Sequence, residues 1–203
     1  MGAAMQTPDA RAWAEALSMY ERRYSYVSVG PRAHQDWVRD VAAVMRREVT
    51  DPRSWRWLDV DEGEEERLEE PFFPFVLPPS APQGAAAWRR GLRTVPRTSV
   101  ERLLVMLSTT WLDVPRERAR NDFETRRPEL ERKARVILSR FPEETSFHTN
   151  AGYPRARTDS RTDAPDFYEA TTGCTPFSQY DWDLGLIAVS ATELGLFWSF
   201  DAT

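Results

Sequence analysis

The stretch LGLIAVSATELGLFWSFDA, residues 184–202, is the part of the sequence that decides the fold. It predicts two strands, at about 184–190 and 195–201, that are joined by a short turn. Trp198 and Phe200 follow the alternation expected along the second strand. Both strands carry apolar side chains on both faces, so we expect a β-hairpin in the interior of a sheet.

Helical spacing of apolar residues dominates the N-terminal two-thirds of the chain. The first fifty residues predict two helices: Asp9 can cap the first, and the second spans about 32–49 after a Gly-Pro break. The apolar segment 99–112 is interpreted as a buried helix. Residues 128–141 form the clearest helix, because apolar residues recur there at helical spacing.

These patterns predict an α+β protein that forms a single domain over residues 1–203. The helical N-terminal two-thirds is expected to pack on a small, mainly antiparallel sheet that includes the C-terminal hairpin. Residues 55–60, WRWLDV, predict one further short strand. An exposed connection is expected at about 59–85, which is first acidic and then rich in proline; the prolines exclude a central strand.

Composition excludes several classes of protein. No apolar run approaches the roughly 20 residues of a membrane span, and the first residues lack the pattern of a signal peptide. Cys174 is the single cysteine, which excludes an intramolecular disulfide. We therefore expect a cytoplasmic protein with no membrane partner. Walker, Rossmann and HExxH motifs are absent, and histidine and cysteine are scarce, so we expect no cofactor and no metal.

Charge is strongly segregated along the chain, although the formal net charge is only -5. Residues 59–70, DVDEGEEERLEE, hold eight carboxylates and one arginine, whereas residues 85–142 hold fourteen basic and seven acidic residues. A local field of this kind steers a charged partner, and flanking aromatic residues can anchor it. The predicted partner-binding residues are Trp55, Trp57, Asp61, Glu62, Glu64, Glu65, Glu66, Phe72, Phe73 and Phe75.

This pattern favours a non-enzymatic protein-binding function with a basic protein as the partner. Small acidic proteins that neutralise basic toxins, such as nuclease inhibitors, depend on the same physics. The expected function is therefore that of an immunity-type inhibitor of a basic bacterial toxin or effector. The alternative for the acidic run is a solvated surface loop.

Two other functions stay open. A hydrolase or transferase would use His148 and Cys174 as a thiol–imidazole pair. Asp181 and Asp183 would join them, because their spacing places both on one face of an extended segment. Nucleic-acid binding would use the arginines of Arg89–Arg97, but the chain is acidic overall, so a nucleic-acid partner is not expected. No basic residue lies within ten positions of Cys174, and we predict an inert thiol.

Overall fold

Antiparallel strands form the centre of the molecule. The computed structural model describes residues 8–21, 23–49, 55–58, 60, 62–75, 82–120, 122–152, 164–169 and 173–201. The main sheet contains β1 (Ser25–Pro31), β2 (Trp55–Trp57), β3 (Arg93–Val95), β4 (Ser146–Thr149), β7 (Trp182–Val189) and β8 (Glu193–Asp201). Their order across the sheet is β2-β1-β8-β7-β4-β3, and every neighbouring pair is antiparallel. A second, two-stranded sheet pairs β5 (Ala151–Gly152) with β6 (Gly173–Cys174).

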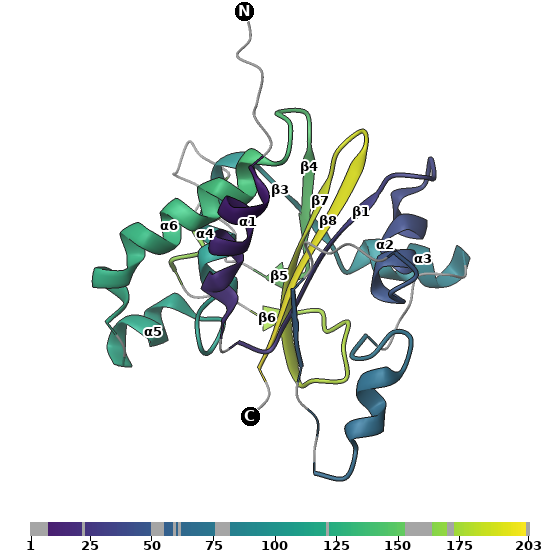
Figure 1. Cartoon of the computed structure of the whole chain (residues 1–203), viewed down its shortest axis with the longest axis horizontal. Coiled ribbons are helices and arrows are strands. Elements are labelled where there is room, and N and C mark those ends of the chain that lie inside the picture. Colours follow the sequence, from purple (N-terminus) through teal and green to yellow (C-terminus); the bar gives the residue numbers. More distant parts are fainter. Residues whose placement is uncertain are drawn as a thin grey trace, which may run out of the picture.

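Helices cover both faces of the main sheet (Figure 1). One face carries α1 (Ala10–Leu17), the 3-10 helix η1 (Ser18–Tyr20), α4 (Arg97–Leu107) and α6 (Phe123–Ser139), with α5 (Val114–Arg120) beside them. The other face carries α2 (Trp37–Met45) and α3 (Pro82–Arg90), and the 3-10 helix η2 (Glu65–Glu69) follows the edge strand β2. The α+β class predicted from the sequence is confirmed, as is the C-terminal hairpin.

The hairpin β7–β8 separates two hydrophobic cores. Leu186 and Phe197 pair across it and face the first core, which lies under α1, α4 and α6. Ile187 and Leu196 also pair, but they face the second core, under α2 and α3. Each strand is therefore apolar on both faces because it is buried on both faces.

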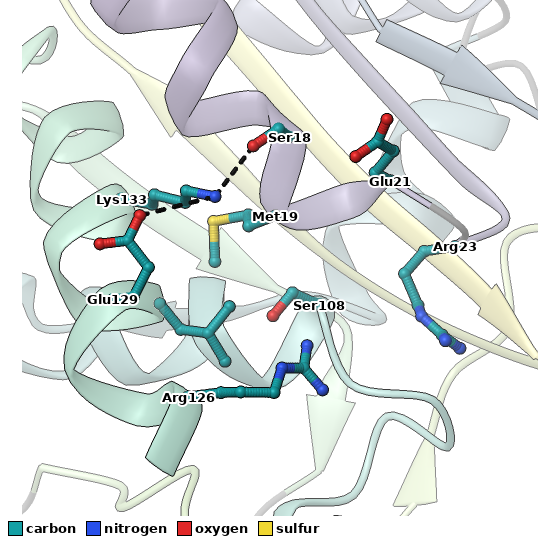
Figure 2. A pocket seen from close by; sticks show the side chains of 9 residues that line it. Ser18, Met19, Glu21, Arg23, Ser108, Arg126, Glu129 and Lys133 are labelled. Carbon is teal, nitrogen blue, oxygen red and sulfur yellow. Dashed lines mark hydrogen bonds and ion pairs between the residues drawn. The ribbon is translucent and has the colours of Figure 1, made fainter. Parts of the chain in front are cut away.

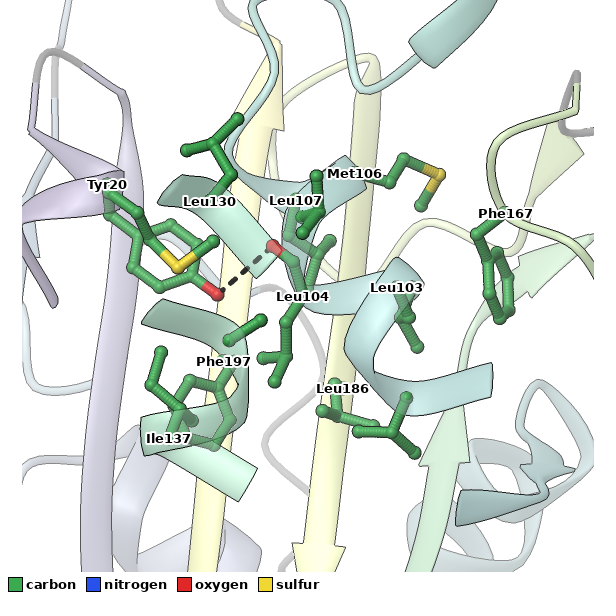
Figure 3. Close-up of a cluster of buried hydrophobic side chains, with 14 of the residues drawn as sticks. Tyr20, Leu103, Leu104, Met106, Leu107, Leu130, Ile137, Phe167, Leu186 and Phe197 are labelled. Atoms are coloured by element: carbon green, nitrogen blue, oxygen red, sulfur yellow. Dashed lines mark hydrogen bonds between the residues drawn. The ribbon is translucent and has the colours of Figure 1, made fainter. Parts of the chain in front are cut away.

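The second half of helix α4, residues 103–107, is completely buried, which explains why it is an unbroken apolar run. Leu103, Leu104 and Leu107 are fully buried and pack with Leu130 of α6 (Figure 3). The hydroxyl of Tyr20 donates a hydrogen bond of 3.4 Å to the carbonyl oxygen of Leu104, which ties η1 to the same helix.

Strand β1 was not predicted from the sequence, which assigned helical character to the first fifty residues. In the structure β1 lies between β2 and β8, and its side chains alternate between the cores. Tyr26 faces the second core, while Val27 and Val29 face the first. β-Branched side chains such as those of Val27 and Val29 fit such a pleated surface. The pairing of β1 with β8 therefore outweighs the helical spacing of the residues before β1.

Two predicted helix boundaries are also wrong. Helix α2 begins at Trp37 rather than near residue 32, because the Asp36 carboxylate caps it by accepting a hydrogen bond from the Val38 amide. Helix α6 begins at Phe123, so Pro128 lies inside it, on an exposed position. Part of the predicted exposed connection is ordered as η2 and α3, while residues 76–81 lie outside the described part of the chain.

Trp198 is expected to be essential for stability. Its side chain is completely buried against Phe75 and Phe177, and it covers Gly185, where a Cβ atom would lie only 2.0 Å from the indole ring. Trp198→Ala should lower the free energy of unfolding by about 3–5 kcal/mol, as loss of a buried aromatic side chain does. Urea unfolding followed by circular dichroism measures this loss. The partly exposed Trp111 gives the control variant Trp111→Ala, and equal unfolding midpoints for both variants and the parent would contradict the assignment.

Candidate functional site

The acidic segment, residues 62–70, is held on the body of the protein through its backbone. An Nη atom of Arg47 donates to the carbonyl oxygen of Leu68 at 3.0 Å, and a second Nη atom donates to that of Glu70. Arg56, on β2, donates to the Leu68 carbonyl at 3.1 Å. Arg47 follows the end of α2 with φ 59°, the left-handed conformation that commonly ends a helix. Two elements thus fix the position of the segment.

The carboxylates of this segment point into solvent. Glu62, Glu65, Glu66 and Glu69 are exposed, and within the described residues no arginine or lysine forms an ion pair with any of them. Backbone amide groups, that of Glu65 itself and that of Gly63, lower the pKa of the Glu65 carboxyl. Glu64 is the exception, because it pairs with Arg67. The acidic segment is therefore an ordered surface on which four carboxylates have no basic partner within the described part of the chain.

The aromatic residues around the acidic segment do not all face outward. Phe75 is fully buried and meets Tyr26 edge to face, with 5.5 Å between ring centroids; Phe73 is buried as well. Both were predicted to contact a partner, but in this structure Phe75 belongs to the second core, and the Phe73 ring meets Tyr180 with 6.3 Å between centroids. Phe72 is half-buried and remains accessible. Asp61 and the side chains of Trp55 and Trp57 lie outside the described part of the chain.

His148 and Cys174 are not brought together. The His148 ring stacks on Trp37 of α2, with 4.8 Å between centroids, and burial lowers the pKa of the imidazole. Cys174 packs against the first core, on the other side of the sheet from α2. Burial raises the pKa of the thiol, although the backbone amide of Asp183 hydrogen-bonds to the sulfur. The two residues do not form the thiol–imidazole pair that covalent catalysis requires.

Asp183 is a buried acceptor rather than an exposed catalytic group. Its Oδ1 accepts from Asn150 Nδ2 at 2.8 Å and from Trp198 Nε1 at 2.9 Å. Its Oδ2 accepts from the amides of Phe177 and Ser178 at 2.9 and 2.8 Å, and from the Ser178 hydroxyl at 2.6 Å. Burial raises the pKa of Asp183, and these hydrogen bonds act against that rise.

The two aspartates therefore do not share a site. Asp181 is exposed, whereas Asp183 has no exposed surface. Asp183 fixes the turn before β7, the end of β4 and the indole of Trp198 in one network. Its role in this structure is to hold the chain together.

Two of the arginines between positions 89 and 97 bind other parts of the chain. Arg89 pairs with Asp36, and Arg97 donates to the carbonyl oxygens of Phe141 and Pro142, both at 2.8 Å. Trp88, the ring nearest to them in the sequence, is completely buried and stacks on Phe177. The Trp88 ring is therefore not accessible for stacking with a nucleic-acid base.

Sequence reasoning missed the two arginines that hold the acidic segment. Arg47 and Arg56 occur among many other arginines, and no local pattern shows that they donate to carbonyl groups more than ten residues away. It also missed a cavity between η1 and α6 (Figure 2), because the residues that line it come from three separate segments of the chain.

Comparison of the chain with models of protein families, with curated proteins and with solved structures found no match. None of the helices that the structure describes is both long and apolar enough to span a bilayer. Within the described ranges, no three His, Cys, Asp or Glu side chains are grouped so that they could hold a metal ion.

Cys174 is expected to react slowly with thiol reagents. Its pKa lies above the ordinary value of 9.0, so less than about 1 % of the thiol is ionised at pH 7, and only the thiolate reacts. Labelling by a chromogenic disulfide reagent should be at least about tenfold slower in the native protein than in urea, and should accelerate as pH rises. Equal native and unfolded rates at pH 7 would instead identify an activated thiol.

Proposed function

We propose that the protein binds a basic protein partner through the acidic segment and has no catalytic activity of its own. The observation that supports this proposal is the way in which the segment is anchored. Arg47, which follows α2, and Arg56, on β2, bind its carbonyl groups. Glu62, Glu65, Glu66 and Glu69 keep no basic partner among the described residues. A fold that holds negative charge in place without compensating it presents that charge to another molecule.

Several acidic residues elsewhere in the chain form ion pairs with arginines. On α6, Glu131 pairs with Arg127 at 2.8 Å, and Glu129 pairs with Arg132 at 2.8 Å. Glu193 forms two hydrogen bonds with the buried Arg140, at 2.7 and 3.0 Å. Several carboxylates outside the acidic segment therefore have arginine partners, although Glu143, Glu144 and Glu169 form no ion pair among the described residues. The acidic segment differs because Glu62, Glu65, Glu66 and Glu69, which also lack such partners there, follow one another closely in the chain.

The energetics favour binding over a purely structural role. Exposed like charges repel one another by a few tenths of a kcal/mol per pair after screening, so the unpaired carboxylates add nothing to folding. A basic partner would relieve that repulsion and would be steered toward the surface at long range. The half-buried Phe72 and Leu68 supply apolar contact area beside the carboxylates.

In its most specific form the proposal is an immunity-type inhibitor that neutralises a basic bacterial toxin or effector in the cytoplasm. Inhibition of this kind needs a fast association rate, which is the property that a steering field improves most. The single cysteine agrees with a reducing compartment.

Removing three charges from the acidic segment should slow association. The variant Glu62→Gln, Glu65→Gln, Glu66→Gln should retain the fold, since none of these residues forms an ion pair within the described chain. At position 65 the oxygen of the new amide can still accept the hydrogen bond from the Gly63 amide. Immobilised parent and variant are used to capture partners from lysate. Surface plasmon resonance at low salt should then show an association rate on the order of tenfold slower for the variant.

The matched control is Glu143→Gln, Glu144→Gln, Glu169→Gln, which removes the same charge from exposed positions outside the acidic segment. The control should capture the same partner as the parent, with nearly the same association rate. The difference between the two triple variants should shrink as salt screens the field. Identical rates for both variants and the parent at low salt would show that the acidic segment is only a solvated loop.

A further inference from the structure

Two arginines of α5 lie over the ring of Trp111, which stands in the turn that joins α4 to α5. The Cζ atom of Arg116 is 5.0 Å from the ring centroid, and the Cζ atom of Arg120 is 5.5 Å from it. Positions 116 and 120 are one helical turn apart, so both side chains leave the same face of α5. Both arginines are exposed and the indole is partly exposed, and together the three residues form the arginine surface.

The turn that carries Trp111 is fixed from inside the protein. Glu117 is only 2 % exposed, and its Oε2 accepts a hydrogen bond of 3.0 Å from the Thr110 amide. Leu112 has φ 52°, a left-handed conformation that is unfavourable for any residue except glycine, and its side chain is buried in the first core. These contacts hold the indole in one place, so the arginine surface is ordered before it meets a ligand.

The positive charge of the arginine surface is not neutralised by any side chain that the structure describes. Within the described ranges Arg116 and Arg120 form no ion pair and donate no side-chain hydrogen bond. Arg118, which lies between them in the sequence, instead pairs with Glu124 at 2.7 Å. Stacking on an indole uses the face of a guanidinium group and leaves the N–H groups in its plane available. An anionic group that accepts from both arginines would also relieve their mutual repulsion.

We propose that the arginine surface binds the acidic segment of a second copy of this chain, so that copies associate head to tail. The acidic segment carries four carboxylates that have no basic partner among the described residues. Guanidinium and carboxylate groups form strong, charge-assisted hydrogen bonds. Half-buried Leu68 and Phe72 lie beside these carboxylates and can pack on the partly exposed Trp111 ring. The two surfaces thus match in charge and in apolar content.

The two surfaces of one molecule cannot meet each other. Helix α5 lies beside α6 on one side of the main sheet, whereas the acidic segment is tied to Arg47, at the end of α2, on the other side (Figure 1). Contact between two different surfaces leaves one of each kind unused at the ends, so the assembly grows with concentration. A nucleic acid is negative along its whole length and would be repelled by the formal net charge of -5, which favours the local charge of a second copy.

This inference goes beyond the protein partner proposed above and does not depend on it. A basic partner and a second copy would compete for the same acidic segment, so self-association would keep that segment covered until the partner arrives. Association of the purified chain is measured without any other protein. Its failure would therefore leave the capture of a basic partner unaffected.

Sedimentation velocity of the purified chain at low salt tests the proposal. The weight-average sedimentation coefficient should rise with protein concentration and should return to the monomer value as salt screens the contact. The variant Arg116→Gln, Arg120→Gln should weaken association by at least about tenfold, since charge-assisted hydrogen bonds are lost. Both side chains are exposed, so this variant should fold normally, and circular dichroism checks that it does.

A mixture of two variants gives the sharpest result. The variant Glu62→Gln, Glu65→Gln, Glu66→Gln should lose association as the arginine variant does, because each lacks one of the two surfaces. Mixed in equal amounts, the two variants should form a dimer and no larger species. In that mixture the intact arginine surface of one variant meets the intact acidic segment of the other.

The matched control for the arginine variant is Arg39→Gln, Arg90→Gln, because both side chains are exposed and form no ion pair among the described residues. The control for the glutamate variant is again Glu143→Gln, Glu144→Gln, Glu169→Gln. Both controls should associate as the parent does.

Four results would overturn the proposal. They are a parent that stays monomeric at low salt up to about 0.5 mM, equal association of the parent and the arginine variant, equal losses in the controls, and a mixture that forms no dimer. A monomeric parent that binds a single-stranded oligonucleotide, and loses this binding in the arginine variant, would assign the surface to nucleic acid instead.

Discussion

The carboxylate of Asp183, on β7, ties the end of β4, the turn before β7 and the partner strand β8 together. It accepts hydrogen bonds from Asn150 at the end of β4, from Ser178 in the turn before β7 and from Trp198 on β8. An unpaired carboxylate at such depth would cost several kcal/mol, and the surrounding donors remove that cost. Because Trp198 fills the second core, the position of its indole determines how α2 and α3 pack on the sheet.

This use of Asp183 bears directly on function. Asp183, one of the two aspartates that the sequence offered for the alternative catalytic function, is engaged by donors on both oxygens. The single thiol is half-buried on the opposite side of the sheet from the His148 ring. Among the described residues, a close group of carboxylates without a basic partner lies elsewhere, on the acidic segment that follows the edge strand β2. Surface charge of this kind is suited to recognition, since a field acts on a partner before contact.

The sequence predicted those parts of the fold whose apolar pattern is long and local. The hairpin β7–β8 and helices α4 and α6 carry such patterns, and each was found. Strand β1 was missed because its strand conformation depends on pairing with β8, at the other end of the sequence. A pattern read over about 10 to 20 neighbouring residues cannot show such a pairing. The exposure of Glu62, Glu65 and Glu66 followed from charge density alone, whereas the burial of Phe73 and Phe75 depends on tertiary packing.

The most direct test of this account is the free energy of unfolding of Asp183→Asn, compared with that of Asp181→Asn. All contacts of the Asp183 carboxylate are with donors, so an amide of the same shape must turn a donor toward other donors. Asp183→Asn should lose on the order of 3 kcal/mol in urea unfolding, and the exposed Asp181→Asn should lose almost nothing. Equal stability of the two variants would contradict the central role of Asp183.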